Sequence, residues 1–335
     1  MNLFDAKYTK YALCNEMMQS TGLIRNYNMV VAQPFLDAIL QTQNLLLTGE
    51  GSSRIFPAKH FRYQLLAEGI DFNVVIEGAT QAMEYKLDDY VVFGVSNSGK
   101  TKELVALFSK LKAENHPAFF GITATPATPV ADLPVRSVVL SCGREQAVAA
   151  TKSVMEQALF FDSLLHEAFH LGKPSMTDIS AKIEEALSVS IDSKIVDILA
   201  KAPVIYFAGR NDGAAEELTL KTNEITRKKS VFLEGTYALH GIEEVMNAGE
   251  ALVVVDPFEQ EEEKFKAILE KGVGVDVIAI SSRETIFPTI RIPDAGAFKN
   301  YVELAAGWNL LVETGLTLGV DLDKPVRARK IGNEA

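Results

Sequence analysis

The chain has 335 residues, a length that suits two domains of ordinary size better than a single hydrophobic core. Its formal net charge of −11 argues against a nucleic-acid surface, which requires clustered Lys and Arg side chains. No apolar run reaches the about 18 residues that a membrane span needs, and the N-terminus lacks the apolar core of a signal peptide. We therefore expect a cytoplasmic protein that has neither a nucleic acid nor a membrane as its partner.

The two cysteines, Cys14 and Cys142, have neither the spacing of a metal site nor the number of a disulfide framework. Each is expected to be a small buried hydrophobic residue. We predict no metal site and no cofactor.

Periodic apolar residues divide the chain into helices and short strands. Helical spacing predicts helix over residues 1–40, and strands then alternate with helices. The predicted strands of the first half are 44–48, 72–76, 91–95, 119–123 and 136–140. Those of the second half are 203–208, 230–233, 251–255, 275–280 and 289–292. The longer helices are predicted at 151–169, 178–201, 214–227 and 297–318.

The two sets of strands form an internal repeat. Leu46 and Ile205 are 159 residues apart, and Val92 and Leu252 are 160 apart. We therefore predict an α/β fold of two duplicated domains, each a three-layer αβα sandwich around a mainly five-stranded, flavodoxin-like parallel sheet. The expected boundaries are 1–173 for the N-terminal helices and first domain, 178–318 for the second domain, and 319–335 for a C-terminal tail.

The run Val91–Val95 is followed by the turn Ser96-Asn-Ser-Gly-Lys-Thr101 and then by a helical pattern. A helix that begins in such a turn presents backbone N–H groups and hydroxyls, which suit a phosphate. An N-cap alone would account for one of the three hydroxyls. We therefore predict a phosphate site at this turn.

The same stretch, Gly94 to Thr101, also fits the nucleotide-binding pattern G-x-x-x-x-G-K-T. A nucleotide site needs an acidic residue at the end of another strand to hold Mg²⁺. Asp256 is the candidate, but it belongs to the other half of the repeat and precedes Pro257. The sequence therefore favours a phosphate on some other molecule over a P-loop hydrolase.

Three other features can be interpreted either as ordinary structural features or as parts of a functional site. Lys221 and Glu224 are spaced i,i+3 on a predicted helix, where a solvated ion pair is common. His240 lies in a loop, although histidine also suits proton transfer near neutral pH. Residues 145–152 read by composition as the start of a helix.

Six motifs nevertheless occur together in one order between about residue 40 and residue 331, and this order resembles the sugar isomerase (SIS) domain superfamily. The chain is most similar to the tandem-SIS isomerase part of glucosamine-6-phosphate synthase and to its stand-alone relatives, the deaminases and deglycases. The motifs are Gly51-Ser52-Ser53, Ser96-Asn97-Ser98-Gly99-x-Thr101, Val148-Ala149-Ala150-Thr151-Lys152, Lys221-x-x-Glu224, His240-Gly241 and the tail 324–330.

The resemblance implies two SIS-type domains and a role for each matched residue. Glu224 would move a proton between C1 and C2, with Lys221 supporting the charge. His240, supplied by the partner subunit of a homodimer, would open the sugar ring. Lys330 would close over the site from the tail and form or assist a Schiff base. Val148 and Ala149 would line the sugar through their backbone, and the phosphate would be held by Ser52, Ser53, Ser96, Asn97, Ser98 and Thr101.

The chain departs from the family pattern at Ala150, at Ile242 and at Lys100, which replaces Glu and creates the P-loop match. No glutaminase domain precedes Met1, which favours the reverse-sense reaction. We therefore expect a deaminase or isomerase that acts on an amino-sugar 6-phosphate similar to glucosamine 6-phosphate. A fructosamine-6-phosphate deglycase and a non-catalytic phosphosugar sensor are the alternatives.

Overall fold

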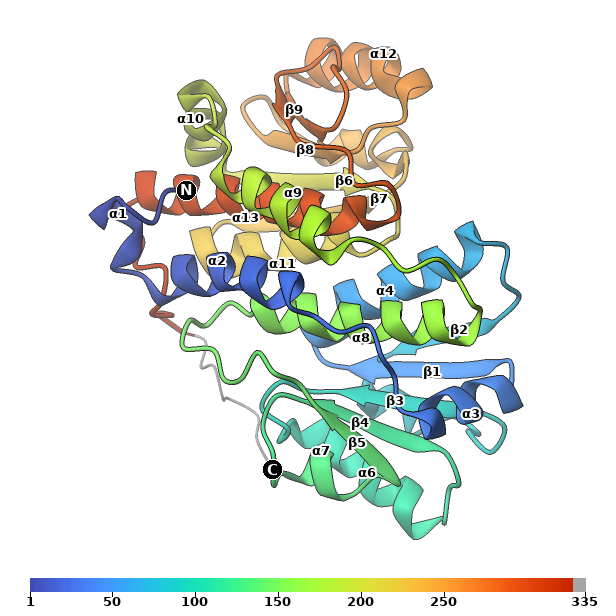
Figure 1. The fold of residues 1–335 in the computed structure, drawn as a ribbon. Coiled ribbons are helices and arrows are strands. Elements are labelled where there is room, and N and C mark those ends of the chain that lie inside the picture. Colours follow the sequence, from blue (N-terminus) through green and yellow to red (C-terminus); the bar gives the residue numbers. More distant parts are fainter. Residues whose placement is uncertain (328–335) are drawn as a thin grey trace. The chain divides into compact units, whose positions relative to one another are not determined.

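The computed structural model describes residues 1–327, which form two compact units (Figure 1). The first-sheet unit contains Asn26–Glu145 and Ala150–Met176. The second-sheet unit contains Met1–Arg25, Gln146–Ala149 and Thr177–Arg327. No helix within these 327 residues is both long enough and apolar enough to cross a membrane.

The first sheet has five parallel strands in the order β2-β1-β3-β4-β5. Helices cover both of its faces, so its three central strands read as nearly continuous apolar runs. The strands are β1 (Asn44–Gly49), β2 (Asn73–Glu77), β3 (Val91–Val95), β4 (Phe119–Thr123) and β5 (Arg136–Val139).

Alternate residues of the central strands pack on opposite faces of the first sheet. Phe93 and Phe120 pack against Phe35 and Phe160, which come from α3 and α8. Val92 instead belongs to a core cluster built with residues of α6 and α7. The helices of this unit are α3 (Gln33–Gln41), α4 (Ser52–Ala67), α5 (Ala79–Ala82), α6 (Lys102–Ala113), α7 (Pro129–Asp132) and α8 (Lys152–Ala168).

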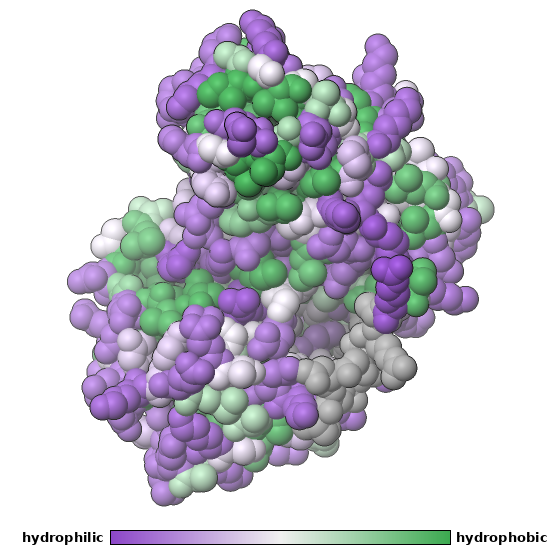
Figure 2. All heavy atoms as spheres, turned by 180° about the vertical axis from the view of Figure 1, so that it is seen from behind, coloured by the Kyte–Doolittle hydropathy of each residue, from purple (hydrophilic) through white to green (hydrophobic). Residues whose placement is uncertain are grey.

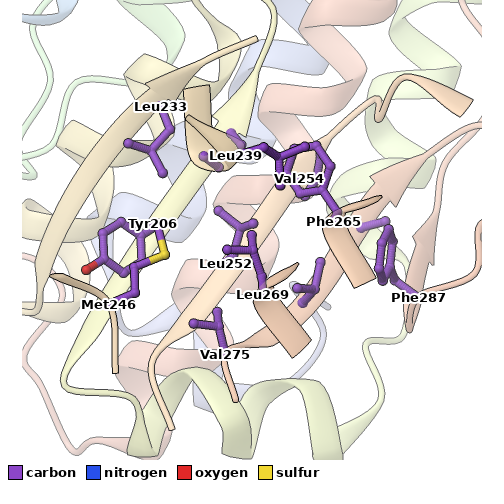
Figure 3. Packing of buried hydrophobic residues seen from close by; sticks show 14 residues of the cluster. Tyr206, Leu233, Leu239, Met246, Leu252, Val254, Phe265, Leu269, Val275 and Phe287 are labelled. Carbon is purple, nitrogen blue, oxygen red and sulfur yellow. The ribbon is translucent and has the colours of Figure 1, made fainter. Parts of the chain in front are cut away.

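The second sheet is also parallel, with the order β10-β9-β8-β6-β7. On one face, Tyr206 and Leu252 pack in a core with Phe265 and Leu269 (Figure 3). The strands are β6 (Val204–Gly209), β7 (Lys229–Glu234), β8 (Ala251–Val255), β9 (Asp276–Ser281) and β10 (Thr289–Arg291).

Seven α-helices, four 3-10 helices and one π-helix, η4, accompany the second sheet within the described residues. The helices are α1 (Ala6–Thr9), α2 (Ala12–Arg25), α9 (Met176–Ser188), α10 (Ser193–Lys201), α11 (Ala214–Thr226), α12 (Glu262–Phe265) and α13 (Lys299–Thr317). The 3-10 and π-helices are η1 (Tyr237–Leu239), η2 (Ile242–Val245), η3 (Glu259–Glu261), η4 (Lys266–Val273) and η5 (Gly296–Phe298). The surface seen in Figure 2 is largely hydrophilic, with apolar side chains exposed in separate patches.

The strand orders confirm the predicted fold class. Replacing β1–β5 by β6–β10 converts the first order into the second, read from the opposite edge. Every predicted strand is present in the described residues, and its observed ends lie within one residue of the predicted ones. The repeat is therefore a repeat of structure as well as of spacing.

The N-terminal region differs from the prediction that residues 1–40 are helical. It forms three helices, and the chain from residue 26 to residue 32 is not helical. The compact units also differ from the predicted first domain of 1–173, because Met1–Arg25 groups with the second sheet. The Met1 ammonium donates to the Leu187 carbonyl at 2.7 Å and to Asn309 Oδ1 at 2.9 Å, and Ser180 Oγ donates to the Thr21 carbonyl.

Candidate functional site

The turn after β3 brings its hydroxyls together at the carboxyl edge of the first sheet. Ser96 Oγ and Thr101 Oγ1 are 2.7 Å apart, and Ser96 Oγ also accepts a bond from Gly99 N. Gly99 has a φ of +70°, and a Cβ there would lie 2.1 Å from Thr128 Oγ1. The turn thus depends on glycine at this position. Ser98 Oγ accepts from Lys100 N at 3.3 Å.

The turn after β1 opens at the same edge, because β1 and β3 are hydrogen-bonded neighbours. Gly51 is the N-cap of α4 and has a φ of +54°. Neither Gly51 nor Thr101, the N-cap of α6, provides a side-chain cap. Two helices of more than two turns therefore begin here, each with the partial positive charge of its first turn. Ser52 and Ser53 form the first two positions of α4.

The structure gives Gly94 a packing role. It lies inside β3, in register with Thr48 of β1 and Gly121 of β4. A Cβ at Gly94 would lie 2.4 Å from the ring of Phe108 on α6. The first glycine of the P-loop pattern is thus required by helix packing, and Lys100 is exposed.

Asn97 is held by a residue that the sequence did not single out. Its Nδ2 donates to Glu145 Oε2 at 3.4 Å, and Glu145 Oε1 accepts from Thr151 N at 2.7 Å. Glu145 is only 1% exposed. The chain between Glu145 and Thr151 is not helical, and α8 begins at Lys152.

Val148 and Ala149 belong to a short segment that groups with the second-sheet unit. Glu16 of α2 accepts from Gln146 N at 2.5 Å and from Ala147 N at 3.2 Å. Val148 is half-buried and Ala149 is buried. A second buried carboxylate, 130 residues away in the sequence, thus fixes the backbone that precedes these two residues.

Lys221 and Glu224 on α11 form a pair in which the lysine is completely buried. Lys221 Nζ lies 2.7 Å from Glu224 Oε2 and 3.1 Å from Glu217 Oε1. Burial opposes the charge of Lys221, but the two carboxylates outweigh it and hold the pKa of this lysine above its ordinary value. The side chain of Glu224 is 26% exposed, while that of Glu217 is buried. The prediction that Lys221 and Glu224 form a solvated ion pair is therefore wrong, because Lys221 is buried.

His240 is exposed and follows η1, after β7. Ala238 and Leu239 lie in the core cluster, and Ile242 packs against it. Ile242, a departure from the family pattern, thus anchors the loop. His240 follows the carboxyl end of β7, whereas Glu224 lies near the end of α11 that leads into the amino end of β7. Lys330 lies outside the described residues.

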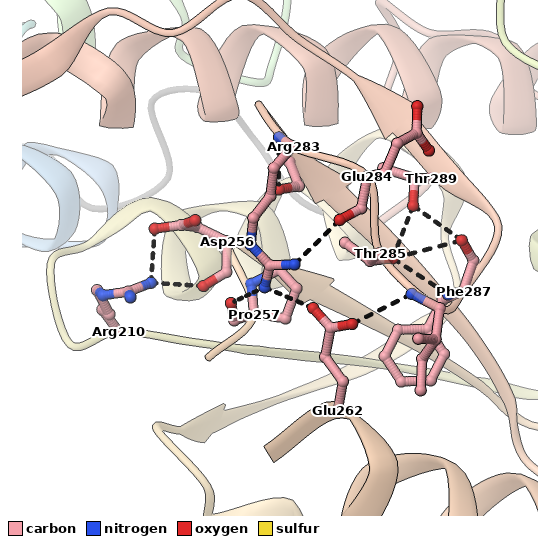
Figure 4. A network of polar contacts seen from close by, with 11 residues as sticks. Arg210, Asp256, Pro257, Glu262, Arg283, Glu284, Thr285, Phe287 and Thr289 are labelled. Atoms are coloured by element: carbon pink, nitrogen blue, oxygen red, sulfur yellow. Dashed lines mark hydrogen bonds and ion pairs between the residues drawn. The ribbon is translucent and has the colours of Figure 1, made fainter. Parts of the chain in front are cut away.

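Asp256 is not available as a magnesium ligand of the first sheet. Its Oδ2 is bonded to Arg210 Nη1 at 2.6 Å in the second-sheet unit (Figure 4). The same oxygen lies 2.6 Å from Lys299 Nζ. Arg283 and Glu262 bond to each other beside it. At this edge of the second sheet, Asp256 and Glu262 are therefore already paired with basic side chains of the same unit.

Comparison with known proteins gives a domain match and several structural likenesses. Residues 38–167, which include the first sheet, match the model of the SIS domain. No curated protein matches the chain.

The structural likenesses extend over both units. The C-terminal domain of glucosamine-fructose-6-phosphate aminotransferase from Francisella tularensis has a TM-score of 0.78 at 17% identity, over 94% of this chain and 98% of that chain. Tagatose-6-phosphate ketose/aldose isomerase from Escherichia coli has a TM-score of 0.78 at 18% identity, over 97% and 99%. Glucosamine-6-phosphate deaminase from Thermotoga maritima has a TM-score of 0.73 at 17% identity, over 95% and 98%. These likenesses show a shared fold.

Proposed function

We propose that the chain is a phosphosugar-processing enzyme, a deaminase or isomerase that acts on an amino-sugar 6-phosphate similar to glucosamine 6-phosphate. The reaction opens the ring and moves a proton between C2 and C1. In deamination, hydrolysis at C2 then releases ammonia. A deaminase for glucosamine 6-phosphate and a ketose/aldose isomerase are among the proteins that share this fold.

The observation that carries the proposal is the pair of helix starts at the carboxyl edge of the first sheet. α4 and α6 follow neighbouring strands, and neither has a side-chain cap. Their N–H groups and dipoles attract an anion, and hydroxyls can donate to its oxygens. In the proposal, the backbone of Val148 and Ala149 lines the sugar, and the phosphate is held here by Ser52, Ser53, Ser96, Asn97, Ser98 and Thr101.

Glu224 is the proposed proton carrier. A carboxylate is a suitable base for a carbon next to a carbonyl, and it must be ionised to act. The hydrogen bond that Lys221 Nζ donates to Glu224 Oε2 orients this carboxyl group. Glu217 on the far side keeps the lysine charged. The part of Glu224 that remains exposed is available for the substrate.

The remaining roles belong to the same proposal. His240 opens the ring, contributed by the second subunit of a homodimer, and Lys330 closes the site from the tail. The chain then comprises two SIS domains, of which the first binds the phosphate and the second carries the proton-transfer residue. We propose no metal or organic cofactor for this reaction.

The test is turnover of a panel of amino-, N-acetylamino- and fructosamine 6-phosphates, with detection of ammonia and of hexose phosphate. Glu224→Gln is expected to lower kcat by about 1,000-fold, within the range for loss of a general base, while the dissociation constant of the sugar phosphate changes by less than about threefold. Glu244→Gln in η2 is the matched control and should retain activity.

Two outcomes would contradict the proposal. Wild-type protein that binds sugar phosphates but converts none of the panel would be a sensor. Loss of binding together with turnover in Glu224→Gln would make Glu224 a structural residue.

A further inference from the structure

The first turn of α4 carries an arginine whose charge is unpaired within the described residues. Arg54 follows Ser52 and Ser53 and is the third residue of the helix. Within residues 1–327 its side chain makes no hydrogen bond, no ion pair and no ring contact. Its Nε is shielded from solvent without an acceptor, whereas its two Nη groups, which are unbonded too, remain accessible. The groups that a ligand can reach are therefore the two Nη groups.

This position is unfavourable for a cation in the free protein. The N–H groups of a first helical turn carry partial positive charge, so a cation beside them is repelled. A long side chain can carry its charged end into water, but the shielded Nε–H of Arg54 would still lack an acceptor. An anion bound beside Arg54 would offset the repulsion, because both the guanidinium and the helix start attract it.

The chain does not supply that anion within residues 1–327. Glu50 is the acidic residue nearest to Arg54 in the sequence, four positions earlier. Its Oε1 instead accepts from Ala79 N at 3.1 Å, at the first residue of α5. The charge of Arg54 is therefore left for a group from outside these residues.

The first turn of α4 also lies against the end of β3. A Cβ added at Gly49 would be 2.7 Å from the carbonyl oxygen of Val95 and 3.6 Å from Ser53 Cβ. Ser53, which precedes Arg54, and Val95, which precedes Ser96, are therefore close together. Side chains of a helix lean towards its N-terminus, which for α4 is the direction of the carboxyl edge of the first sheet.

We infer that Arg54 supplies the positive charge of the phosphate site and makes this site selective for a dianion. The inference rests on the proposed function and deepens it, because the six residues proposed to hold the phosphate are all neutral. The two Nη groups of a guanidinium present parallel N–H donors to an oxyanion, and the attraction grows with the charge of the anion.

This charge distinguishes two esters of the same shape. A phosphate monoester is mostly dianionic at about pH 7.5, since its second pKa is about 6. A sulfate ester carries one negative charge at the same pH. The site should therefore prefer a sugar phosphate to the corresponding sugar sulfate, and Arg54 should account for much of that preference.

The experiment measures the dissociation constants of glucosamine 6-phosphate and glucosamine 6-sulfate by calorimetry at about pH 7.5. In Arg54→Gln, binding of the phosphate should weaken about 50-fold and binding of the sulfate about fivefold, so the preference falls about tenfold. Arg54→Lys keeps the charge but loses the planar fork, so its preference should stay within about threefold of the wild type. A loss of preference in Arg54→Lys as large as in Arg54→Gln would contradict a role of charge.

Arg62→Gln is the matched control, because it removes the same charge from the same helix. Arg62 lies about two turns further along α4 and is likewise unpaired within the described residues. None of its side-chain nitrogens is both shielded and unbonded. Both dissociation constants of this variant should stay within about twofold of the wild-type values.

A melting curve without ligand checks that Arg54 has no structural partner. Arg54→Gln removes a repelled cation, so its melting temperature should equal or exceed that of the wild type. A fall of several degrees would overturn the inference, because Arg54 would then stabilise the fold itself. Equal weakening of both esters in Arg54→Gln, or weakening of neither, would overturn it as well.

The binding constants separate this inference from the proposed function, since they are measured without turnover. A wild type that shows the Arg54-dependent preference but converts none of the sugar phosphates would overturn the proposed function alone. Conversion of a sugar phosphate with an unchanged KM in Arg54→Gln would overturn the inference alone.

Discussion

The carboxyl edges of the two sheets have equivalent places in the repeat and opposite chemistry. At the first edge the turn after β3 carries the hydroxyls of Ser96 and Thr101 in front of an uncapped helix. At the second edge the equivalent turn, after β8, begins with Asp256, bonded to Arg210 and Lys299. The second edge thus carries the carboxylate of Asp256 at the place where the first edge carries hydroxyl groups. One scaffold therefore carries the proposed ligand site at its first edge and a set of internal ion pairs at its second edge.

The largest effect on ligand binding is expected when an aspartate, as found at the second edge, replaces a serine of the first edge. Ser96→Asp would put a fixed carboxylate where Ser96 Oγ now meets Thr101 Oγ1. Repulsion and the lost donor should weaken binding of a hexose 6-phosphate by about 100-fold or more, measured by calorimetry. Ser96→Ala, which removes the donor alone, should weaken it about tenfold. Equal effects of the two variants would show that charge at this position is irrelevant.

A smaller effect is expected at the second edge, where a buried carboxyl group should change the stability of the fold. Glu303 on α13 is buried there; burial and the nearby Asp212 raise its pKa well above the ordinary value, against the opposing charges of Lys299 and Arg210. The folded state thus keeps a proton that the unfolded state loses as the pH rises above about 4.5, so this group makes stability fall with rising pH.

Glu303→Gln removes that ionisation. Its melting temperature should exceed that of the wild type by about 2–4 °C at pH 8, and the difference should shrink towards pH 5. A difference that grows towards low pH would contradict the raised pKa. Sugar-phosphate affinity should stay unchanged, because the proposal places the phosphate at the first edge.

The smallest effect is expected at Lys100. It completes the P-loop pattern, yet it is exposed, and the first glycine of that pattern packs against Phe108. Lys100→Glu should change the affinity for a hexose 6-phosphate by less than about threefold, because its charge is screened by solvent. Stabilisation of the wild type by ATP that exceeds stabilisation by glucosamine 6-phosphate, and its loss in Lys100→Glu, would restore the nucleotide reading.

The sequence predicted the strands well because buried parallel strands are short apolar runs such as Val91–Val95 and Ala251–Val255. It also predicted the hydroxyl-rich turn, because turn chemistry is local. It missed Glu16 and Glu145, whose bonds to the 146–147 backbone and to Asn97 span 130 and 48 residues. Such bonds leave no local pattern.

The sequence also predicted wrongly that the Lys221–Glu224 ion pair is solvated, because burial decides this and is not visible in the local sequence. Residues spaced i,i+3 on a helix are usually solvated, and nothing local shows that Lys221 lies wholly inside the unit with Glu217 as a second partner. The grouping of Met1–Arg25 with the second sheet depended in the same way on distant contacts with Leu187 and Asn309.

A crystal structure with glucosamine 6-phosphate tests the contrast between the two edges most directly. The account predicts the phosphate at the starts of α4 and α6, within hydrogen-bond distance of Ser96, Ser98 and Thr101, with the ion pairs of Asp256 intact. A phosphate bound by Arg210 and Lys299 in place of Asp256 would contradict it.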